Sequence, residues 1–390
     1  MNNFMNAYKH ALVSLNSHSV RQCILKQQYR AASLYAGPAL GLDKYVMARE
    51  KVATQMHGLS DKFRIKMKDF VSQGSKNMIF TEDLKSMVHL GEPDDLELVR
   101  QMILKFNNQN KELRFGSFIF GPVVMRLFHH LDQPDLALKT FEDPESAGFF
   151  DQFMSYHILM DLLYKHKKYD EVLRVFEYAV TKQANMTKYP KHLVVLAMAA
   201  CYQQNTGASF EYAKKLWGNL SEVGHIPMRR AVTFFAGLAL KQGAPHVALE
   251  VSMSVRNQMY VTIRSLKVAA LADLDRADDA LPILRGVLEY DSAENLKNTF
   301  TRDAIDKLKA SVERSNNKDV NRELNPIIKG LEDRKLIDNK TIDDLLCVQI
   351  QQSINNVNNQ DNRLHSTFRN NSAPFNRKSY SRPGLSDNLY

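Results

Sequence analysis

Two apolar stripes of helical period follow one another within residues 154–180. The first runs over residues 156–164 and the second over residues 172–179. In each stripe apolar residues recur three or four positions apart, which places them on one side of an α-helix. The basic run 165–168 separates the two stripes. The segment therefore predicts two short helices joined by a turn, and each helix needs neighbours to bury its stripe.

The second stripe recurs along the chain at intervals of 35, 41, 35 and 32 residues. An alanine or valine holds the same place in all five copies: Ala137, Val172, Ala213, Ala248 and Ala280. A period near 35 with two helices per unit predicts an all-α fold, a right-handed superhelical solenoid of stacked antiparallel helix pairs. The alternative is a non-repetitive helical domain in which these segments are similar by chance.

The segment 155–177, SYHILMDLLYKHKKYDEVLRVFE, resembles a pentatricopeptide repeat. Ser-Tyr-His stands where that family opens its first helix with Thr/Ser-Tyr-Asn, and Asp-Glu-Val-Leu-Arg-Val-Phe stands in its second helix. The resemblance covers about residues 115–290. The tetratricopeptide pattern is not met, because the single tryptophan, Trp217, lies in a predicted second helix. Tyr202 and Trp217 are expected in the core, and the alternative for both is a platform on which a base stacks.

The flanks of the repeats differ in composition. Residues 1–42 contain four basic and no acidic side chains, which predicts a mitochondrial transit peptide, or alternatively the flexible basic N-terminus of a cytosolic protein. Residues 43–114 predict an N-terminal helical cap with degenerate repeats, and residues 291–350 a C-terminal helical cap. The Asn-, Ser- and Arg-rich residues 351–390 predict a disordered tail.

Positive charge is concentrated on the best-matching repeats. The chain has a formal net charge of +9, and residues 153–267 hold 15 basic against 7 acidic side chains. Such an excess attracts phosphates. The alternative is a set of solvated turns and helix ends. The candidate phosphate contacts are Lys165, Lys167, Lys168, Lys214, Lys215, Arg229 and Arg230.

In the pentatricopeptide family each repeat reads one base through two or three side chains. The resemblance assigns the base-reading place to His157, His192, Thr233 and Ser265, called the reader residues below. For each of them the alternative is a polar residue on the wall of the groove. The second reading position of each unit cannot be placed, because the unit ends are irregular.

No enzyme motif is present: the sequence has no Gly-rich phosphate loop and no His-Glu-x-x-His motif. Three widely spaced cysteines exclude a local zinc cluster and a disulfide framework. His129 and His130 are expected as a capping or surface pair. We therefore expect neither catalysis nor a cofactor, and no apolar run is long enough to span a membrane.

The resemblance implies a mitochondrial matrix protein that binds single-stranded mitochondrial RNA and serves maturation, processing or stability of transcripts, and so the respiratory chain. An RNA-processing nuclease or the mitochondrial ribosome would be a further partner. The alternative function is a helical-repeat scaffold for protein interaction, such as a mitochondrial ribosome-associated subunit. The sequence leaves the oligomeric state open.

Overall fold

The computed structural model describes residues 33–72, 76–112, 118–289 and 299–351. Most of the predicted leader and nearly all of the predicted tail lie outside the described residues. The described part is built from helices, with one two-residue parallel strand pair in which Phe300 is in register with Ile337. No helix in the described ranges is long and apolar enough to cross a membrane.

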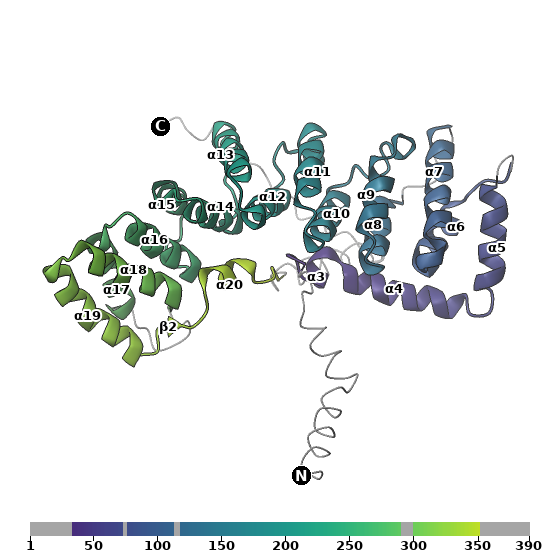
Figure 1. Cartoon of the computed structure of the whole chain (residues 1–390). Coiled ribbons are helices and arrows are strands. Elements are labelled where there is room, and N and C mark those ends of the chain that lie inside the picture. Colours follow the sequence, from purple (N-terminus) through teal and green to yellow (C-terminus); the bar gives the residue numbers. More distant parts are fainter. Residues whose placement is uncertain (1–32, 73–75, 113–117, 290–298, 352–390) are drawn as a thin grey trace, which may run out of the picture. The chain divides into compact units, whose positions relative to one another are not determined.

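The helices follow one another as pairs (Figure 1). Before the pairs stand α3 (Gly37–Leu40), α4 (Leu42–Gln55) and α5 (Ser60–Val71). The pairs are α6 (Thr81–Leu90) with α7 (Leu96–Glu112), α8 (Gly121–His130) with α9 (Pro134–Glu142), α10 (Phe153–Lys165) with α11 (Tyr169–Thr181), α12 (Lys191–Gln204) with α13 (Gly207–Glu222), α14 (Arg229–Lys241) with α15 (Pro245–Met253), α16 (Val261–Asp273) with α17 (Ala277–Glu289), and α18 (Arg302–Ser315) with α19 (Lys318–Asp333). Short elements complete the chain: the 3₁₀ turns Pro93–Asp95, Pro144–Ser146 and Ala184–Met186, the strands β1 (Phe300–Thr301) and β2 (Ile337–Asp338), and α20 (Ile342–Cys347).

The first helix of each pair packs against the first helix of the next, from α6 through to α18. First and second helices of a pair also pack on each other, so that each apolar stripe is covered on two sides. The predicted all-α class and the helical repeat are thereby confirmed. The strand pair lies after the last predicted repeat and leaves the helical stack uninterrupted.

The five small positions predicted from the repeat lie in the core. Ala137, Val172, Ala213, Ala248 and Ala280 are all fully buried in the second helices. Small side chains at these positions let neighbouring helices approach closely, because a larger side chain would have to displace a packed neighbour.

Ala213→Leu is therefore expected to lower the free energy of unfolding by about 2 kcal/mol, the cost of overpacking a filled core. Ala208→Leu is the matched control, because Ala208 lies exposed in the first turn of the same helix. Urea unfolding of both variants measures the difference. Equal stability of the two variants would contradict the assignment of Ala213 to a helix contact.

From α8 onward, every pair turns through a residue with left-handed backbone, which gives an exact register for the repeat; the α6–α7 connection has none. These residues are Asp132, Lys167, Asn205, Gly243, Asp275 and Asn316, with φ of 58°, 60°, 48°, 68°, 55° and 47°. In several of these turns the following amide donates back five residues to the first helix, as Lys168 N does to Leu163 O at 3.0 Å. This is a common way to satisfy the last carbonyls of a helix. Equivalent residues of different pairs can therefore be found by counting back from the turn.

Three segments from the two ends of the described chain lie across the first helices, on the lower side in Figure 1. α4 packs on α6 and α8, α3 packs on α10, and α20 packs on α14 and α16. Leu34, Tyr35, Leu40 and Leu346 are buried members of the same core as the repeats. The two ends of the described part of the chain thus belong to the fold of the repeats.

Candidate nucleic-acid interface

Counting back from the turns shows where the reader residues lie. His157, Thr233 and Ser265 each stand ten residues before the turn residues Lys167, Gly243 and Asp275, so they occupy one equivalent position in α10, α14 and α16. His192 stands thirteen residues before Asn205, and the residue ten before that turn is Val195. We call the surface that carries this position the first-helix face. Its residues used below are Arg126, His157, Asp161, His192, Arg230, Thr233, Gly237 and Ser265.

The structure brings His157 and His192 together beneath Tyr35, where His157 is buried and His192 half-buried. The two imidazole rings stack with centroids 5.3 Å apart, and the Tyr35 ring meets His157 edge-on at 4.3 Å. The Tyr35 hydroxyl lies 3.2 Å from His192 Nδ1. Only 3% of His157 is exposed, and its Nε2 has no partner within the described part of the chain.

The state of His157 follows from this burial. The pKa of His157 is lowered to about 3, mainly by desolvation and also by the charge of a protonated His192, while Asp161 acts in the opposite direction. Burial likewise lowers the pKa of His192. Both rings are therefore neutral at physiological pH. They could hydrogen-bond a base edge or stack on it, but they offer no charge to a phosphate.

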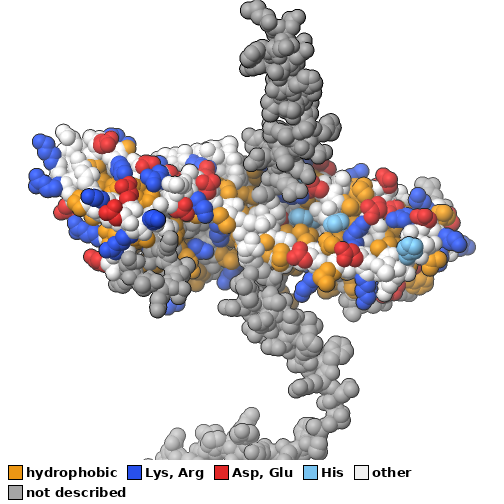
Figure 2. Space-filling view, turned by 90° about the horizontal axis from the view of Figure 1, so that it is seen from below, with side chains coloured by type: hydrophobic (Ala, Val, Ile, Leu, Met, Phe, Trp, Pro, Cys, Tyr) orange, Lys and Arg blue, Asp and Glu red, His pale blue; other side chains and the backbone are white. Residues whose placement is uncertain are grey.

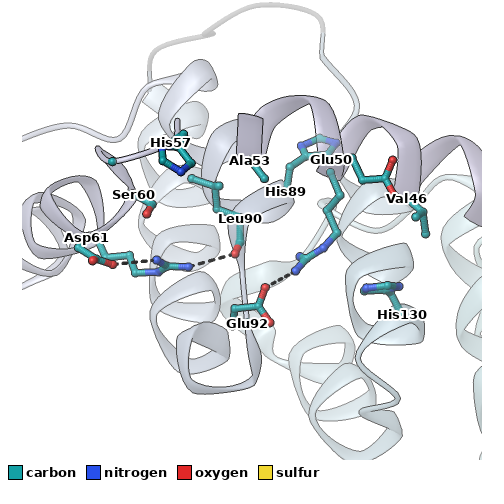
Figure 3. A pocket seen from close by; sticks show the side chains of 13 residues that line it. Val46, Glu50, Ala53, His57, Ser60, Asp61, His89, Leu90, Glu92 and His130 are labelled. Atoms are coloured by element: carbon teal, nitrogen blue, oxygen red, sulfur yellow. Dashed lines mark hydrogen bonds and ion pairs between the residues drawn. The ribbon is translucent and has the colours of Figure 1, made fainter. Parts of the chain in front are cut away.

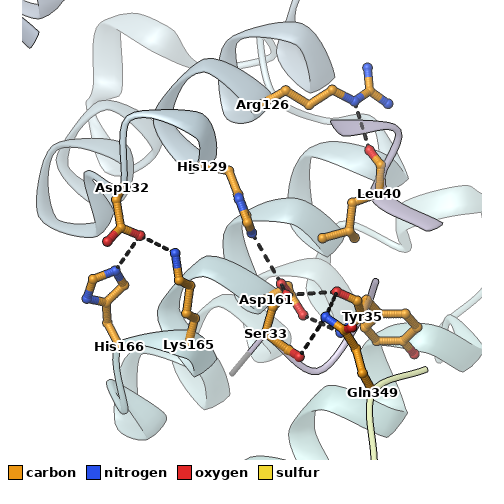
Figure 4. A network of polar contacts seen from close by, with 10 residues as sticks. All are labelled: Ser33, Tyr35, Leu40, Arg126, His129, Asp132, Asp161, Lys165, His166 and Gln349. Carbon is orange, nitrogen blue, oxygen red and sulfur yellow. Dashed lines mark hydrogen bonds and ion pairs between the residues drawn. The ribbon is translucent and has the colours of Figure 1, made fainter. Parts of the chain in front are cut away.

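Asp161 is the centre of a polar network under the N-terminal segment (Figure 4). Its carboxylate is fully buried and accepts hydrogen bonds from the Ser33 hydroxyl and, at 2.9 Å, from the Tyr35 amide. His129 Nε2 lies 3.3 Å away. His129 and His130 were expected at the surface. This is wrong for His129, whose imidazole is buried because it contacts the Asp161 carboxylate, whereas His130 is exposed.

Thr233 and Ser265 are covered as well. Thr233 Oγ1 donates to the carbonyl of Arg230 at 2.9 Å, and Ser265 Oγ accepts from the Thr301 amide at 3.2 Å. The guanidinium of Arg230 donates to the Leu345 carbonyl at 3.0 Å and to the Val348 carbonyl. All four reader residues thus lie on the first helices as expected, and three of them are almost fully buried by the chain itself.

The predicted phosphate contacts divide into three groups. Lys165 ends α10 and Lys168 ends the turn that follows it. They pair with Asp132 at 2.5 Å and Asp135 at 2.6 Å, both from the preceding pair. Lys167 is the left-handed residue of that turn. His166 also bonds Asp132, at 2.9 Å. The turn therefore carries less net positive charge than the sequence indicates.

The remaining cations lie on α13 and at the start of α14. Lys214 pairs with Glu211 at 2.6 Å on its own helix, and Lys215 is exposed. The Arg229 guanidinium sits 3.7 Å from the centre of the Tyr260 ring, a cation–π contact. Figure 2 shows Lys and Arg interspersed with Asp and Glu on the face seen from below Figure 1. On this face the basic residues of the repeats do not gather into one continuous surface.

A cavity of about 690 Å³ lies between α4, α5, α6 and α8 (Figure 3). Its two arginines are already paired: Arg49 with Glu92, and Arg64 with Asp61 at 3.2 Å and Asp95 at 2.9 Å. Both guanidinium groups also donate to backbone carbonyls at the end of α6: Arg49 to Gly91 and Arg64 to Leu90. The cavity therefore offers little free positive charge for an anion. Within the described ranges no cluster of His, Cys, Asp or Glu has the arrangement of a metal site.

The reasoning from sequence missed Asp161, Tyr35 and Gly237. A signal for Asp161 was present, because it interrupts an otherwise apolar run in α10, and a buried charge needs partners. Tyr35 gave no signal, since its partners are more than 120 positions away in the chain.

Comparison with known proteins identifies homologues. The chain is homologous to pentatricopeptide repeat-containing protein 2, mitochondrial, of several vertebrates. It is 26% identical over 307 residues to the Xenopus laevis protein, covering 77% of this chain and 78% of the relative. Identity to the Homo sapiens protein is 26% over 273 residues, 70% of this chain and 69% of the relative, and identity to the Danio rerio protein is 27% over 303 residues, 77% of each. No family model matches the chain.

Proposed function

We propose that the protein binds single-stranded mitochondrial RNA in the matrix and acts in the maturation, processing or stability of mitochondrial transcripts, without catalysing a reaction itself. The observation that carries the proposal is the similarity to a mitochondrial pentatricopeptide repeat protein over about three quarters of the chain, together with the stacked helix pairs. Stacked pairs of this kind place one side chain per unit at an equivalent position, which suits one-base-per-repeat reading.

The leader proposal is sharpened by the position of the first described residues. Leu34, Tyr35 and Leu40 are buried in the core, so a transit peptide that ends before Ser33 would leave these core residues in the mature chain. We place the cleavage between Arg21 and Ser33. Sequencing the N-terminus of the protein isolated from mitochondria tests this, and a mature chain that begins after Leu40 would contradict it.

A second candidate, a scaffold for protein interaction, has one specific observation in its favour. The first-helix face already holds backbone groups of the terminal segments, because the Tyr35 amide and the carbonyls of Leu345 and Val348 are bound by its side chains. A face that binds backbone of its own chain could bind backbone of a partner. The RNA proposal and the scaffold proposal differ in what is recovered with the protein from mitochondria.

We expect that replacing Lys165, Lys167 and Lys168 together by Gln weakens RNA binding. The plot of the logarithm of the association constant against the logarithm of the salt concentration should become shallower, with its slope smaller in magnitude by up to about 2. The change should be the same for different RNA sequences, because phosphate contacts position the RNA and base contacts specify it. Fluorescence anisotropy over a salt series measures the slope.

Lys307→Gln is the control for this series. Lys307 pairs with Asp273 at 2.7 Å, again between neighbouring helix pairs, but it lies outside the basic repeats. It should leave the slope unchanged. An unchanged slope in the triple variant would show that RNA does not contact the turn after α10.

A further inference from the structure

The two ends of the described chain meet over the first-helix face. Tyr35 and Ile350 form a parallel β-bridge: Ala36 N donates to Ile350 O at 2.9 Å, and Ile350 N donates to Leu34 O at 2.8 Å. The Gln349 side-chain amide adds hydrogen bonds to the carbonyls of Ser33 and Tyr35. We call residues 33–36 and 345–350 together the clasp.

One repeated position of the first helices is adapted to the terminal segments. Arg126, Asp161 and Gly237 each stand six residues before their turn residue. Arg126 Nε donates to the Leu40 carbonyl at 2.8 Å, next to the clasp, and Asp161 accepts from Ser33 and Tyr35. A Cβ on Gly237 would lie 2.8 Å from a Leu346 methyl carbon and 2.9 Å from the Tyr202 ring. In three different repeats the residue at the same position thus contacts a terminal segment of the described chain, which indicates a specialised arrangement rather than a chance contact.

The closed clasp leaves polar atoms unsatisfied beneath it. His157 Nε2 and Arg230 Nε are buried without a partner within the described chain. A buried polar atom without a partner is destabilising relative to a hydrogen-bonded one, because it has lost its contact with water. A ligand with several acceptors could satisfy these atoms where the clasp does not. A ligand that offers acceptors to these atoms would therefore match the polar groups of the first-helix face better than the clasp does.

The two strands of the clasp are joined to each other by few hydrogen bonds, although Leu34, Tyr35 and Leu346 are buried against the first helices. The link between its two strands is two backbone hydrogen bonds and one glutamine side chain. Gly41, with φ of +70°, joins α3 to α4 and can change conformation more readily than other residues. The first helices contact one another directly, and these contacts do not pass through the clasp.

We propose that the clasp is a built-in competitor: it closes the first-helix face, and single-stranded RNA reaches His157, His192 and Thr233 only when the clasp opens. This inference rests on the proposed function, since it names what opens the face. It predicts that the affinity for RNA is reduced by the fraction of molecules that are closed.

The test locks the clasp reversibly. Leu34→Cys and Gln349→Cys, adjacent to the bridge and on opposite strands, are combined with Cys23→Ser and Cys347→Ser to prevent other disulfides. The probe is fluorescein-labelled single-stranded RNA of random sequence. We expect the oxidised protein to bind at least roughly tenfold more weakly than the same protein reduced by dithiothreitol. Equal affinity of the oxidised and reduced forms would overturn the clasp proposal and leave the proposed RNA function standing.

An opened variant tests the opposite direction. Gly237→Ala pushes against Leu346 and Tyr202 and should increase RNA affinity, whereas Gly218→Ala, where an added Cβ meets nothing within 4 Å, should not. If Gly237→Ala binds a synthetic peptide of residues 341–351 but no RNA, the face is a peptide site and the RNA part of the inference is wrong.

Hydrogen exchange separates the clasp from the proposed function, because it needs no ligand. The amides of Ala36 and Ile350 should exchange by local opening, faster than the buried amides of α12. If these amides exchange by local opening but the protein binds no RNA, the proposed function is wrong, while the proposal that the clasp opens still stands. Exchange of Ala36 and Ile350 only at the rate of global unfolding would refute the opening itself.

Discussion

Asp161→Ala lowers the free energy of unfolding by about 3 kcal/mol, because it removes the acceptor of a buried polar network. The Tyr35 amide and the His129 ring lose their partner inside the core, and the Ser33 hydroxyl loses one of its two. Asp161→Asn should cost less, since its remaining oxygen can still accept from the Tyr35 amide. Urea unfolding, followed by circular dichroism, measures the losses.

Asp135→Ala is the matched control for Asp161→Ala. Asp135 pairs with Lys168, but its side chain is 80% exposed, so the pair is screened by water and its loss should cost less than about 1 kcal/mol. A loss at Asp161 no larger than the loss at Asp135 would mean that the network in Figure 4 contributes nothing to stability.

His157→Leu makes the protein less sensitive to acid. The pKa of His157 is about 3 in the folded protein and about 6.5 in the unfolded chain, so between these values the unfolded chain binds a proton that the folded protein does not. Stability is therefore lost as the pH falls below 6.5. At about pH 5 the loss caused by this residue is about 2 kcal/mol.

The measurement is urea unfolding of the wild type and His157→Leu at about pH 7.5 and about pH 5. The wild type should lose about 2 kcal/mol more than the variant over this range, whatever the variant costs at the higher pH. His192 and other buried histidines also resist protonation, so both proteins will lose stability in acid and only the difference belongs to His157. Parallel losses in the two proteins would show that His157 titrates normally.

The helical repeat could be predicted from sequence because its signals are local. Helical period, a recurring small residue and a spacing near 35 are all visible without long-range contacts, and the five small residues are buried as expected. The ion pairs of Lys165 and Lys168 could also have been predicted from sequence. Their partners, Asp132 and Asp135, lie 33 residues earlier, one repeat back, where a stacked neighbour must be.

The covering of the reader residues could not be predicted in the same way. Tyr35 lies 126 residues from Asp161 and 157 from His192, and the Arg230 guanidinium reaches carbonyls 115 and 118 residues away. No periodic pattern links such positions, because the terminal segments are not repeats. The sequence also did not show that Val195, rather than His192, occupies the equivalent reader position in α12. Lys167 and Asp275 are ordinary turn residues in sequence, and their left-handed backbone, which fixes the register, appears only in the structure.

Crosslinking in intact mitochondria tests the central claim most directly. The protein is irradiated with ultraviolet light in its own compartment, purified under denaturing conditions, and the attached RNA is sequenced. We predict fragments of particular mitochondrial transcripts, enriched over a chain that lacks the basic side chains of Lys165, Lys167 and Lys168. Recovery of no RNA above a mock control would contradict an RNA-binding function, and recovery of ribosomal RNA alone, together with ribosomal proteins in a native purification, would support the scaffold instead.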